Sequence, residues 1–298
     1  MMKKMQIAQV DVPKGVINLG VGQPQVDLLS LDKINLAWEH QVQQSQPEIL
    51  QYGMQKGDAR LRNELAGFLG QAYDAEVDPG ALQITGGVSQ ALDLICTLLT
   101  RPGDTIVVEE PTYFLALRIF KDHHLNLVGT PMDEHGLVIP ALEQRVRKYN
   151  PKLVYTIPVY HNPTGITLSA ERREALARLS AAYDFMIVAD EVYQLLSYDD
   201  SPPLPMVFFD KNENVISLGS FSKIMAPGLR LGWMHAHQKL LEPFWMCGLF
   251  DSGGGPNPFN AGIVSSAIKL GYQREILHHL KNTYRNRRDV LARALSEH

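Results

Sequence analysis

The segment Ser220-Phe221-Ser222-Lys223, followed by Gly228-Leu229-Arg230-Leu231-Gly232, places one lysine beside two hydroxyls and a guanidinium. A lysine that forms a Schiff base must lose its proton, which burial and neighbouring cations favour. A phosphate group needs hydrogen-bond donors, which Ser220, Ser222 and Arg230 would supply. The tetrapeptide alone is also common in polar surface turns, so its interpretation depends on the other motifs of the chain.

Two further polar motifs precede this segment. Asp190 and Tyr193 lie in Val188-Ala189-Asp190-Glu191-Val192-Tyr193, and Asn162 lies in His161-Asn162-Pro163-Thr164-Gly165. A buried carboxylate keeps a facing pyridine nitrogen protonated, while a phenol and an amide suit hydrogen bonds to a phenolic oxygen. The alternatives are ordinary, because a strand-end aspartate can cap the next helix and Asn-Pro-x-Gly forms turns in any protein.

A glycine loop, Thr85-Gly86-Gly87-Val88-Ser89-Gln90, leads into a helix with periodic apolar residues. Glycines that open a helix expose backbone N–H groups and the positive end of the helix dipole, which favours an anion site. No Gly-Lys-Ser/Thr follows, so this is not a P-loop. Gln25 takes the third glycine position of Gly20-Val21-Gly22-Gln23-Pro24-Gln25, which excludes a dinucleotide fingerprint. A tight strand-to-helix turn explains Gly86 and Gly87 equally well.

Short apolar strands alternate with helices along the chain. The strand candidates are Thr105–Glu109, Leu153–Ile157, Phe185–Ala189 and Val215–Leu218, and the clearest helices are Val88–Leu99 and Ser169–Tyr183. This alternation predicts an α/β fold with a mostly parallel central sheet flanked by helices. Ligands of such sheets bind outside the carboxyl ends of the strands, so Asn162, Asp190 and Lys223 are expected to converge there.

Composition excludes several classes of protein. The 298 residues carry 28 Lys+Arg against 32 Asp+Glu, a net charge of −4, without a basic run that would suit nucleic acid or an anionic membrane. Cys96 and Cys247 are too few for a disulfide scaffold, and no apolar run approaches the ~20 residues of a membrane helix. The N-terminus lacks the apolar core of a signal peptide, so a cytoplasmic protein is expected. The histidine pairs at 123–124 and 278–279 lack further ligands, so no metal is expected.

The motifs also follow a definite order, from the glycine loop through Pro111-Thr112-Tyr113, Asn162 and Asp190-x-x-Tyr193 to Ser220-x-Ser222-Lys223 and Arg230. In this order they resemble the class I and II aminotransferases, a family of fold-type-I pyridoxal-phosphate (PLP) enzymes with the aspartate-aminotransferase fold. The resemblance runs from about Asn18 to the end of the chain. It implies the PLP-binding large domain of that fold, with an incomplete small domain.

The resemblance assigns a role to each motif. Lys223 forms the internal aldimine and shuttles a proton, Asp190 pairs with the pyridinium nitrogen, and Tyr193 and Asn162 bind the phenolic oxygen. Tyr113 stacks on the ring, a contact that contributes on the order of 1 kcal/mol beyond burial. The residues implied to hold the phosphate are Gly87, Val88, Ser89, Ser220, Ser222 and Arg230.

Two more matches concern the partner subunit and the substrate. Tyr52, in Leu50-Gln51-Tyr52-Gly53, matches the tyrosine that reaches the phosphate of a neighbouring subunit, which implies a homodimer with shared sites. Gly22 matches a glycine segment that lies over the substrate, and Asn162 is a second substrate contact. By resemblance, residues 1–27 form an N-terminal arm, 28–272 the large PLP-binding domain, and 273–298 the interdomain helix and the start of a small domain.

The implied reaction moves an amino group between an amino acid and a 2-oxo acid. Cofactor motifs do not separate this reaction from a PLP-dependent lyase or synthase, because the pocket selects which bond breaks. A cofactor-sensing transcription regulator would carry an N-terminal DNA-binding domain, for which the residues before Asn18 leave no room. A catalytically weakened fragment that only binds the cofactor is the remaining alternative.

The last part of the chain departs from the family pattern. Family members have a small domain with an arginine that clamps the substrate carboxylate, and this sequence stops at His298 inside what resembles the interdomain helix. We therefore expect cofactor binding with weak transamination. The arginines of this charged helix are expected to be solvated, and its apolar face around Ile276, Leu280 and Leu291 to be exposed. Glycines 253–255 fit either a close approach to the cofactor or dimer interface, or a flexible loop.

Overall fold

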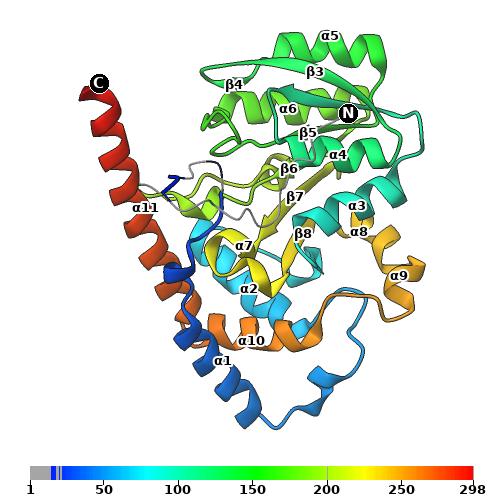
Figure 1. The fold of residues 1–298 in the computed structure, drawn as a ribbon. Coiled ribbons are helices and arrows are strands. Elements are labelled where there is room, and N and C mark those ends of the chain that lie inside the picture. Colours follow the sequence, from blue (N-terminus) through cyan, green and yellow to red (C-terminus); the bar gives the residue numbers. More distant parts are fainter. Residues whose placement is uncertain (1–14, 18–19, 21, 200, 298) are drawn as a thin grey trace.

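The structure is a computed structural model that describes residues 15–17, 20, 22–199 and 201–297. Within these residues the chain forms an eight-stranded sheet in the order β1-β8-β7-β6-β5-β2-β3-β4 (Figure 1). The strands are β1 Leu82–Thr85, β2 Thr105–Glu110, β3 Asn126–Asp133, β4 Gly136–Leu137, β5 Leu153–Thr156, β6 Met186–Asp190, β7 Val215–Ser220 and β8 Gly232–Ala236. The four predicted strands are β2, β5, β6 and β7, each within two residues of its expected bounds.

The centre of the sheet is parallel. Strands β3, β2, β5, β6 and β7 pair in parallel, whereas β8 runs antiparallel to both β7 and β1, and β4 runs antiparallel to β3. Every residue of β5 and of β7 is buried, as expected of strands that are covered on both faces. The predicted α/β fold with a mostly parallel sheet is confirmed.

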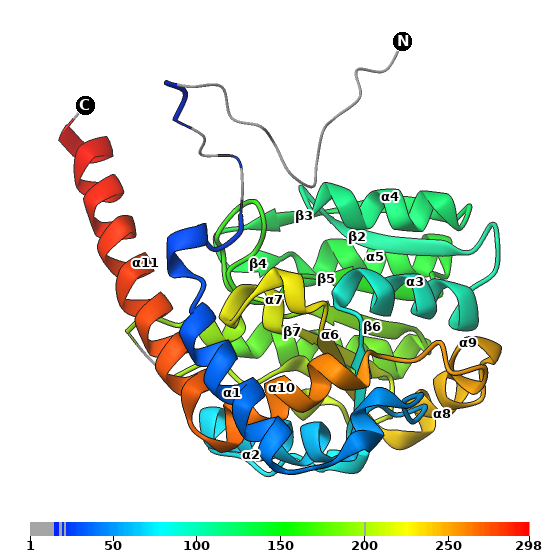
Figure 2. The same cartoon turned by 60° about the horizontal axis from the view of Figure 1, so that its bottom comes forward.

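Helices cover the sheet on both faces (Figures 1 and 2). The helices are α1 Leu31–Gln43, α2 Ala59–Tyr73, α3 Val88–Leu99, α4 Phe114–Asp122, α5 Ile139–Tyr149, α6 Ala170–Tyr183, α7 Phe221–Ile224, α8 Gln238–Trp245, α9 Gly248–Asp251, α10 Pro258–Lys269 and α11 Tyr272–Glu297. One buried cluster joins α3, α4 and α8 to Tyr155 and Val188, and another joins α5 and α6 to Val154 and Ile187. Neighbouring residues of one strand therefore face opposite helical layers.

Local sequence explains where the two predicted helices begin. Helix α3 has the predicted bounds and starts after Gly87, whose φ of +97° suits glycine. Helix α6 begins after Ser169, whose side chain accepts a hydrogen bond from the Arg172 amide at 3.4 Å. Its last turn ends at Asp184 in the left-handed conformation, with φ of +55°.

The last helix, α11, lies along one side of the molecule beside α1 and α10, and its final turns extend away from the sheet (Figures 1 and 2). The expected exposure of its apolar face is wrong for Ile276 and Leu280. Both side chains are buried in a cluster that includes Ile224 of α7, and only Leu291 among the three is exposed. Arg288 forms an ion pair with Asp199 at 3.1 Å, so the charged face partly anchors the helix.

Two predictions concern how the chain is organised into domains. Asn18, where the family resemblance begins, lies outside the described residues. The domain boundaries proposed at 27/28 and 272/273 stay predictions, although α11 does begin at Tyr272. Among the helices of the described residues, none combines the length and apolar character that a membrane span requires.

Candidate active site

The ends of three neighbouring strands carry the predicted polar residues. Asp190 is the last residue of β6, Ser220 is the last residue of β7, and Asn162 follows the end of β5. These strands pair in parallel, β5 with β6 and β6 with β7, so their carboxyl ends share one edge of the sheet. The structure therefore brings these three motifs together as the sequence predicts.

Lys223 follows directly in the short helix α7. Ser220 precedes this helix, and its hydroxyl accepts a hydrogen bond from the Ser222 amide at 3.1 Å. The Lys223 Nζ donates to the backbone oxygen of Gly22 at 2.5 Å, which brings the predicted substrate-covering segment to the lysine. Burial lowers the pKa of Lys223, against the opposing effect of the Asp190 charge. A partly desolvated amine of this kind is easier to deprotonate than a surface lysine.

Asp190 is 4% exposed and has two carboxylate oxygens in different situations. Its Oδ2 accepts a hydrogen bond from the Tyr155 hydroxyl at 2.8 Å, whereas Oδ1 is buried without a hydrogen-bond partner among the described residues. Burial raises the pKa of Asp190 to about 6, against the lowering effects of Tyr155, the Val192 amide and Lys223. A buried acceptor without a partner is costly, so Oδ1 is suited to a donor that a ligand brings.

Tyr193, Asn162 and Tyr113 surround this carboxylate. Burial, together with the negative charge of Asp190, raises the pKa of Tyr193 to about 12, and a side-chain hydrogen bond with Asn162 opposes that rise. Burial and Asp190 also raise the pKa of Tyr113, which is half-buried just before α4. Both phenols therefore remain protonated at neutral pH and can act as hydrogen-bond donors.

The glycine loop meets Arg230 at the start of α3. Arg230 Nη2 donates to the Gly86 carbonyl at 2.8 Å, and a Cβ added at Gly87 would lie 2.9 Å from the same nitrogen. The guanidinium therefore lies against a turn that only glycine fits. Val88 and Ser89 form the first turn of α3, whose N–H groups have no partner inside the helix. Together with Ser220 and Ser222, these groups form a donor set suited to a phosphate.

Tyr52 is a predicted site residue whose side chain faces solvent in the single chain. Its side chain is 84% exposed, and its ring packs on Gly253, where an added Cβ would lie 2.6 Å from Cδ1. Gly253 has φ of +84°, so both conformation and space favour glycine there. Gly253 therefore packs against Tyr52 of its own chain, and both alternatives for glycines 253–255, a close approach to the cofactor or dimer interface and a flexible loop, stay predictions.

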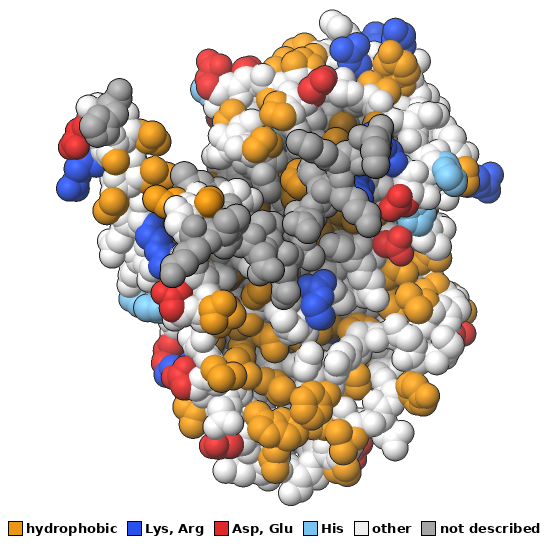
Figure 3. All heavy atoms as spheres, in the orientation of Figure 1, with side chains coloured by type: hydrophobic (Ala, Val, Ile, Leu, Met, Phe, Trp, Pro, Cys, Tyr) orange, Lys and Arg blue, Asp and Glu red, His pale blue; other side chains and the backbone are white. Residues whose placement is uncertain are grey.

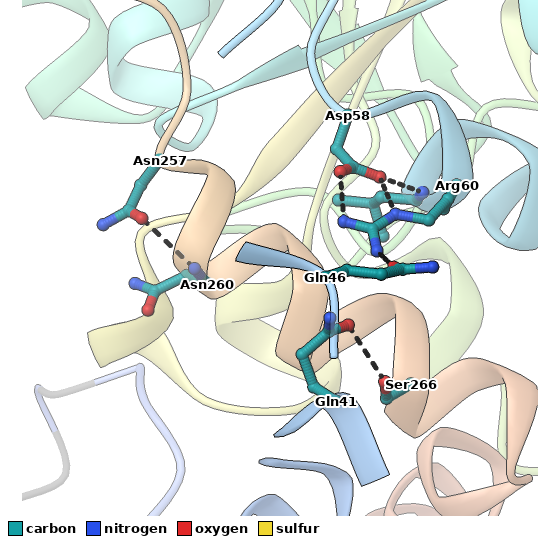
Figure 4. A network of polar contacts seen from close by, with 8 residues as sticks. Gln41, Gln46, Asp58, Arg60, Asn257, Asn260 and Ser266 are labelled. Atoms are coloured by element: carbon teal, nitrogen blue, oxygen red, sulfur yellow. Dashed lines mark hydrogen bonds and ion pairs between the residues drawn. The ribbon is translucent and has the colours of Figure 1, made fainter. Parts of the chain in front are cut away.

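Polar contacts fix the loop that carries Tyr52 (Figure 4). Arg60 hydrogen-bonds both Gln46, before the loop, and Asp58, after it, which ties the two ends of the loop together. On the facing helix, Asn257 caps α10 by accepting from the Asn260 amide at 3.2 Å. The exposed position of Tyr52 is therefore built into the fold.

The family model for aminotransferases of class I and II matches residues 14–297. The chain belongs to this family. It is accordingly a PLP-dependent aminotransferase, and the predicted family resemblance is confirmed. The aminotransferase is 35% identical to "Aromatic-amino-acid aminotransferase 1" of Thermococcus litoralis, over 95% of this chain and 69% of that protein.

Two further comparisons concern a protein named as a transcriptional regulator and a solved aminotransferase structure. The aminotransferase is 31% identical to the uncharacterized HTH-type transcriptional regulator YisV of Bacillus subtilis, over 95% of this chain and 58% of that protein. It superposes on a Pyrococcus horikoshii kynurenine aminotransferase, solved with PMP and substrates, with a TM-score of 0.86 and 32% identity. That alignment covers 93% of this chain and 69% of the other.

The residues present fit the cofactor that the family implies. The buried, unpartnered Oδ1 of Asp190 suits a protonated ring nitrogen, and Lys223 offers an amine with a lowered pKa. The α3 turn with Arg230 offers donors for a phosphate. Among the described residues, no three His, Cys, Asp or Glu side chains are grouped closely enough to hold a metal ion.

Sequence reasoning missed a buried group of polar residues at the same edge of the aminotransferase sheet. Glu109, 2% exposed, accepts hydrogen bonds from the Thr156 hydroxyl at 2.5 Å and the Ile157 amide at 2.8 Å. His161 Nε2 lies 3.1 Å from the same carboxylate, directly before Asn162. Glu109 thus supports the loop that presents Asn162. The sequence signal was the pair of acidic residues, Glu109 and Glu110, that directly follows the apolar run of β2.

Proposed function

We propose that this aminotransferase holds PLP on Lys223 and moves the amino group of an aromatic amino acid to a 2-oxo acid. One observation carries the proposal. Lys223 lies close enough to Asp190 to feel its charge, and the buried Oδ1 of Asp190 has no hydrogen-bond partner among the described residues. When bound, the cofactor supplies an electron-withdrawing ring that weakens the bonds at the substrate Cα.

The chain's own residues then have separate tasks. Asp190 Oδ1 would accept a hydrogen bond from the protonated ring nitrogen and so keep that nitrogen charged. Tyr193 and Asn162 would donate hydrogen bonds to the phenolic oxygen, and Tyr113 would cover the ring face. Lys223 Nζ, once neutral, takes and returns the proton at the substrate Cα. The Gly22 carbonyl, 2.5 Å from Nζ, lies where it orients that amine.

Two observations support an aromatic amino donor. The relatives with 35% and 32% identity carry names that refer to aromatic amino acids and to kynurenine. Tyr160, partly exposed beside Asn162, has its hydroxyl 2.6 Å from Ser197 Oγ and so offers a fixed aromatic face near the site. An aromatic side chain of the substrate would pack on such a face.

Single-turnover assays test the donor. Protein loaded with PLP is mixed with phenylalanine, tyrosine, kynurenine, 2-aminoadipate or alanine, without an acceptor, and the released 2-oxo acid is measured. We expect stoichiometric 2-oxo acid from the aromatic donors at a rate constant about tenfold or more above that of alanine. Faster turnover of alanine would reject the aromatic preference. Release of ammonia along with the 2-oxo acid would indicate lyase chemistry instead.

We also propose a homodimer in which Tyr52 completes the phosphate site of the partner subunit. Tyr52 is exposed on a tied loop, while Arg230 of the same chain already contacts the Gly86 carbonyl before α3. Hydrophobic side chains gather over α1 and α10 near this loop (Figure 3). They line a shallow hollow formed by Leu31, Ile34, Trp38, Phe259 and Ile263. An exposed apolar surface of this kind is typical of a subunit interface.

Hybrid dimers test the crossing of Tyr52. A Tyr52→Ala chain and a Lys223→Ala chain are coexpressed with different tags, and the mixed dimer is purified. If Tyr52 acts across the interface, the mixed dimer contains one intact site and we expect about half the parental kcat, because a twofold dimer has two equivalent sites. If Tyr52 acts within its own chain, neither site is intact and the activity per dimer falls to about half that of the Tyr52→Ala homodimer, because only one of the two sites retains Lys223. A monomeric protein saturated with cofactor would overturn the proposal directly.

A further inference from the structure

Tyr155 lies one strand away from Asp190, in the middle of β5. It pairs in register with Val188 of β6, so Tyr155, Val188 and Asp190 face the same side of the sheet. Tyr155 is 0% exposed, and its ring packs edge-on against Phe120, with the ring centroids 5.3 Å apart. The phenol hydroxyl reaches Asp190, the last residue of the neighbouring strand β6.

The Tyr155 hydroxyl makes a defined contact with one side of the carboxylate. It donates to Oδ2 at 2.8 Å, and Oδ1 is left as the oxygen without a hydrogen-bond partner among the described residues. Burial, the negative charge of Asp190 and the hydrogen bond to it all raise the pKa of Tyr155 well above its ordinary value, so the hydroxyl stays protonated and remains a donor. The direction of this hydrogen bond therefore does not reverse within the working pH range.

We propose that Tyr155 is a positioning residue for transamination, which occupies Asp190 Oδ2 and so directs Oδ1 toward the ring nitrogen of the cofactor. This inference rests on the proposed PLP site. It adds a residue that does not touch the cofactor and acts through Asp190 alone. The Tyr155 hydroxyl on Oδ2 and the Val192 amide together hold the carboxylate, and losing the hydroxyl removes one of these two constraints on the direction of Oδ1.

Other charged and titratable groups also face Asp190, and they remain when Tyr155 is changed. They come from β2, from the turn before α4, from the segment after β6 and from α7: Glu109, Tyr113, Glu191, Tyr193 and Lys223. Of these, Lys223 favours the charged carboxylate, whereas Glu109 disfavours it. Removing the Tyr155 hydroxyl therefore takes away one stabilising hydrogen bond while the surrounding charges stay fixed.

The test compares Tyr155→Phe with Tyr73→Phe in the full chain. Tyr73 is a matched control, because its hydroxyl also donates to a side chain, Gln194 Oε1 at 3.1 Å. In cofactor-free protein labelled with [4-¹³C]aspartate, the Asp190 carboxyl signal is assigned by its loss in Asp190→Asn and is titrated with pH. We expect Tyr155→Phe to bind the Asp190 proton about tenfold more tightly, because a donor to the charged carboxylate is lost. Tyr73→Phe should leave this proton affinity unchanged.

With cofactor and saturating substrates, Tyr155→Phe should lower kcat about tenfold and change KM less than twofold. A second variant is expected to change the proton affinity of Asp190 in the opposite direction, and it keeps an aromatic ring of similar shape. 3-Fluorotyrosine at position 155 is a stronger donor, so it should weaken proton binding at Asp190. Unchanged Asp190 proton affinity in both Tyr155 variants would overturn the proposal, as would an equal effect of Tyr73→Phe. Failure of the parent to bind PLP would instead reject the proposed function, since the cofactor-free titration does not depend on it.

Discussion

Replacing Lys223 with alanine is expected to abolish covalent attachment of PLP and to lower kcat by a factor of about 10,000. In the parent, reduction with borohydride followed by peptide mapping should place the pyridoxyl group on Lys223. The reason is its position, because Lys223 is partly desolvated in α7 and its Nζ contacts the Gly22 carbonyl. A pyridoxyl group on any other lysine of the parent would show that the assignment is wrong.

Two control variants test whether the effect of Lys223→Ala comes from the loss of the amine itself. One controls for the burial of a lysine and the other for its positive charge. Lys281 in α11 is half-buried, and burial lowers its pKa as it does that of Lys223, yet it lies outside the strand-end cluster. Lys281→Ala should therefore keep the parental kcat. Lys223→Arg keeps a positive charge beside Asp190 but has no amine that can become neutral at working pH. We expect it to be as inactive as Lys223→Ala while it retains noncovalent cofactor binding.

The convergence of polar residues at the strand ends could be predicted, because apolar runs in the sequence locate the buried strands. Buried parallel strands read as short apolar runs, and their carboxyl ends lie along one edge of the sheet. Asn162, Asp190 and Ser220 each follow or end such a run, so their convergence could be inferred before any pairing was known. The glycine loop was predictable for a similar reason, since Gly87 opens a helix against Arg230.

Residues that act through partners distant in the sequence were not predictable in this way. Tyr155 reads as an ordinary aromatic residue of a strand, and its contact with Asp190 becomes visible only through the register of β5 with β6. The expected exposure of Ile276 and Leu280 failed because both pack in a buried cluster with residues distant in the sequence, among them Ile224 of α7, more than fifty residues earlier. The proposed role of Tyr52 depends on a second subunit and therefore stays a prediction.

Replacing Asp190 with asparagine is expected to lower kcat about a thousandfold while noncovalent cofactor binding survives, because a neutral amide does not hold the ring nitrogen charged. Alanine at this position should lose a similar factor and should also leave Tyr155 without its acceptor. Asparagine is the sharper test, since its amide oxygen can still accept from Tyr155. Equal single-turnover rates for Asp190→Asn and the parent would reject the role of the carboxylate.

The same variant makes a prediction about folding without cofactor. Burial raises the pKa of Asp190 from 3.8 to about 6, so between these values the folded protein holds a proton that the unfolded chain has released. The free energy of unfolding must therefore fall as pH rises through this window, by on the order of 3 kcal/mol, and stay low above it. Asp190→Asn lacks this titration, so its stability relative to the parent should rise from pH 4 to pH 7 in urea unfolding of cofactor-free protein. A constant difference between the two across that range would mean that Asp190 is ionised in the folded chain as readily as in water, and that burial does not raise its pKa.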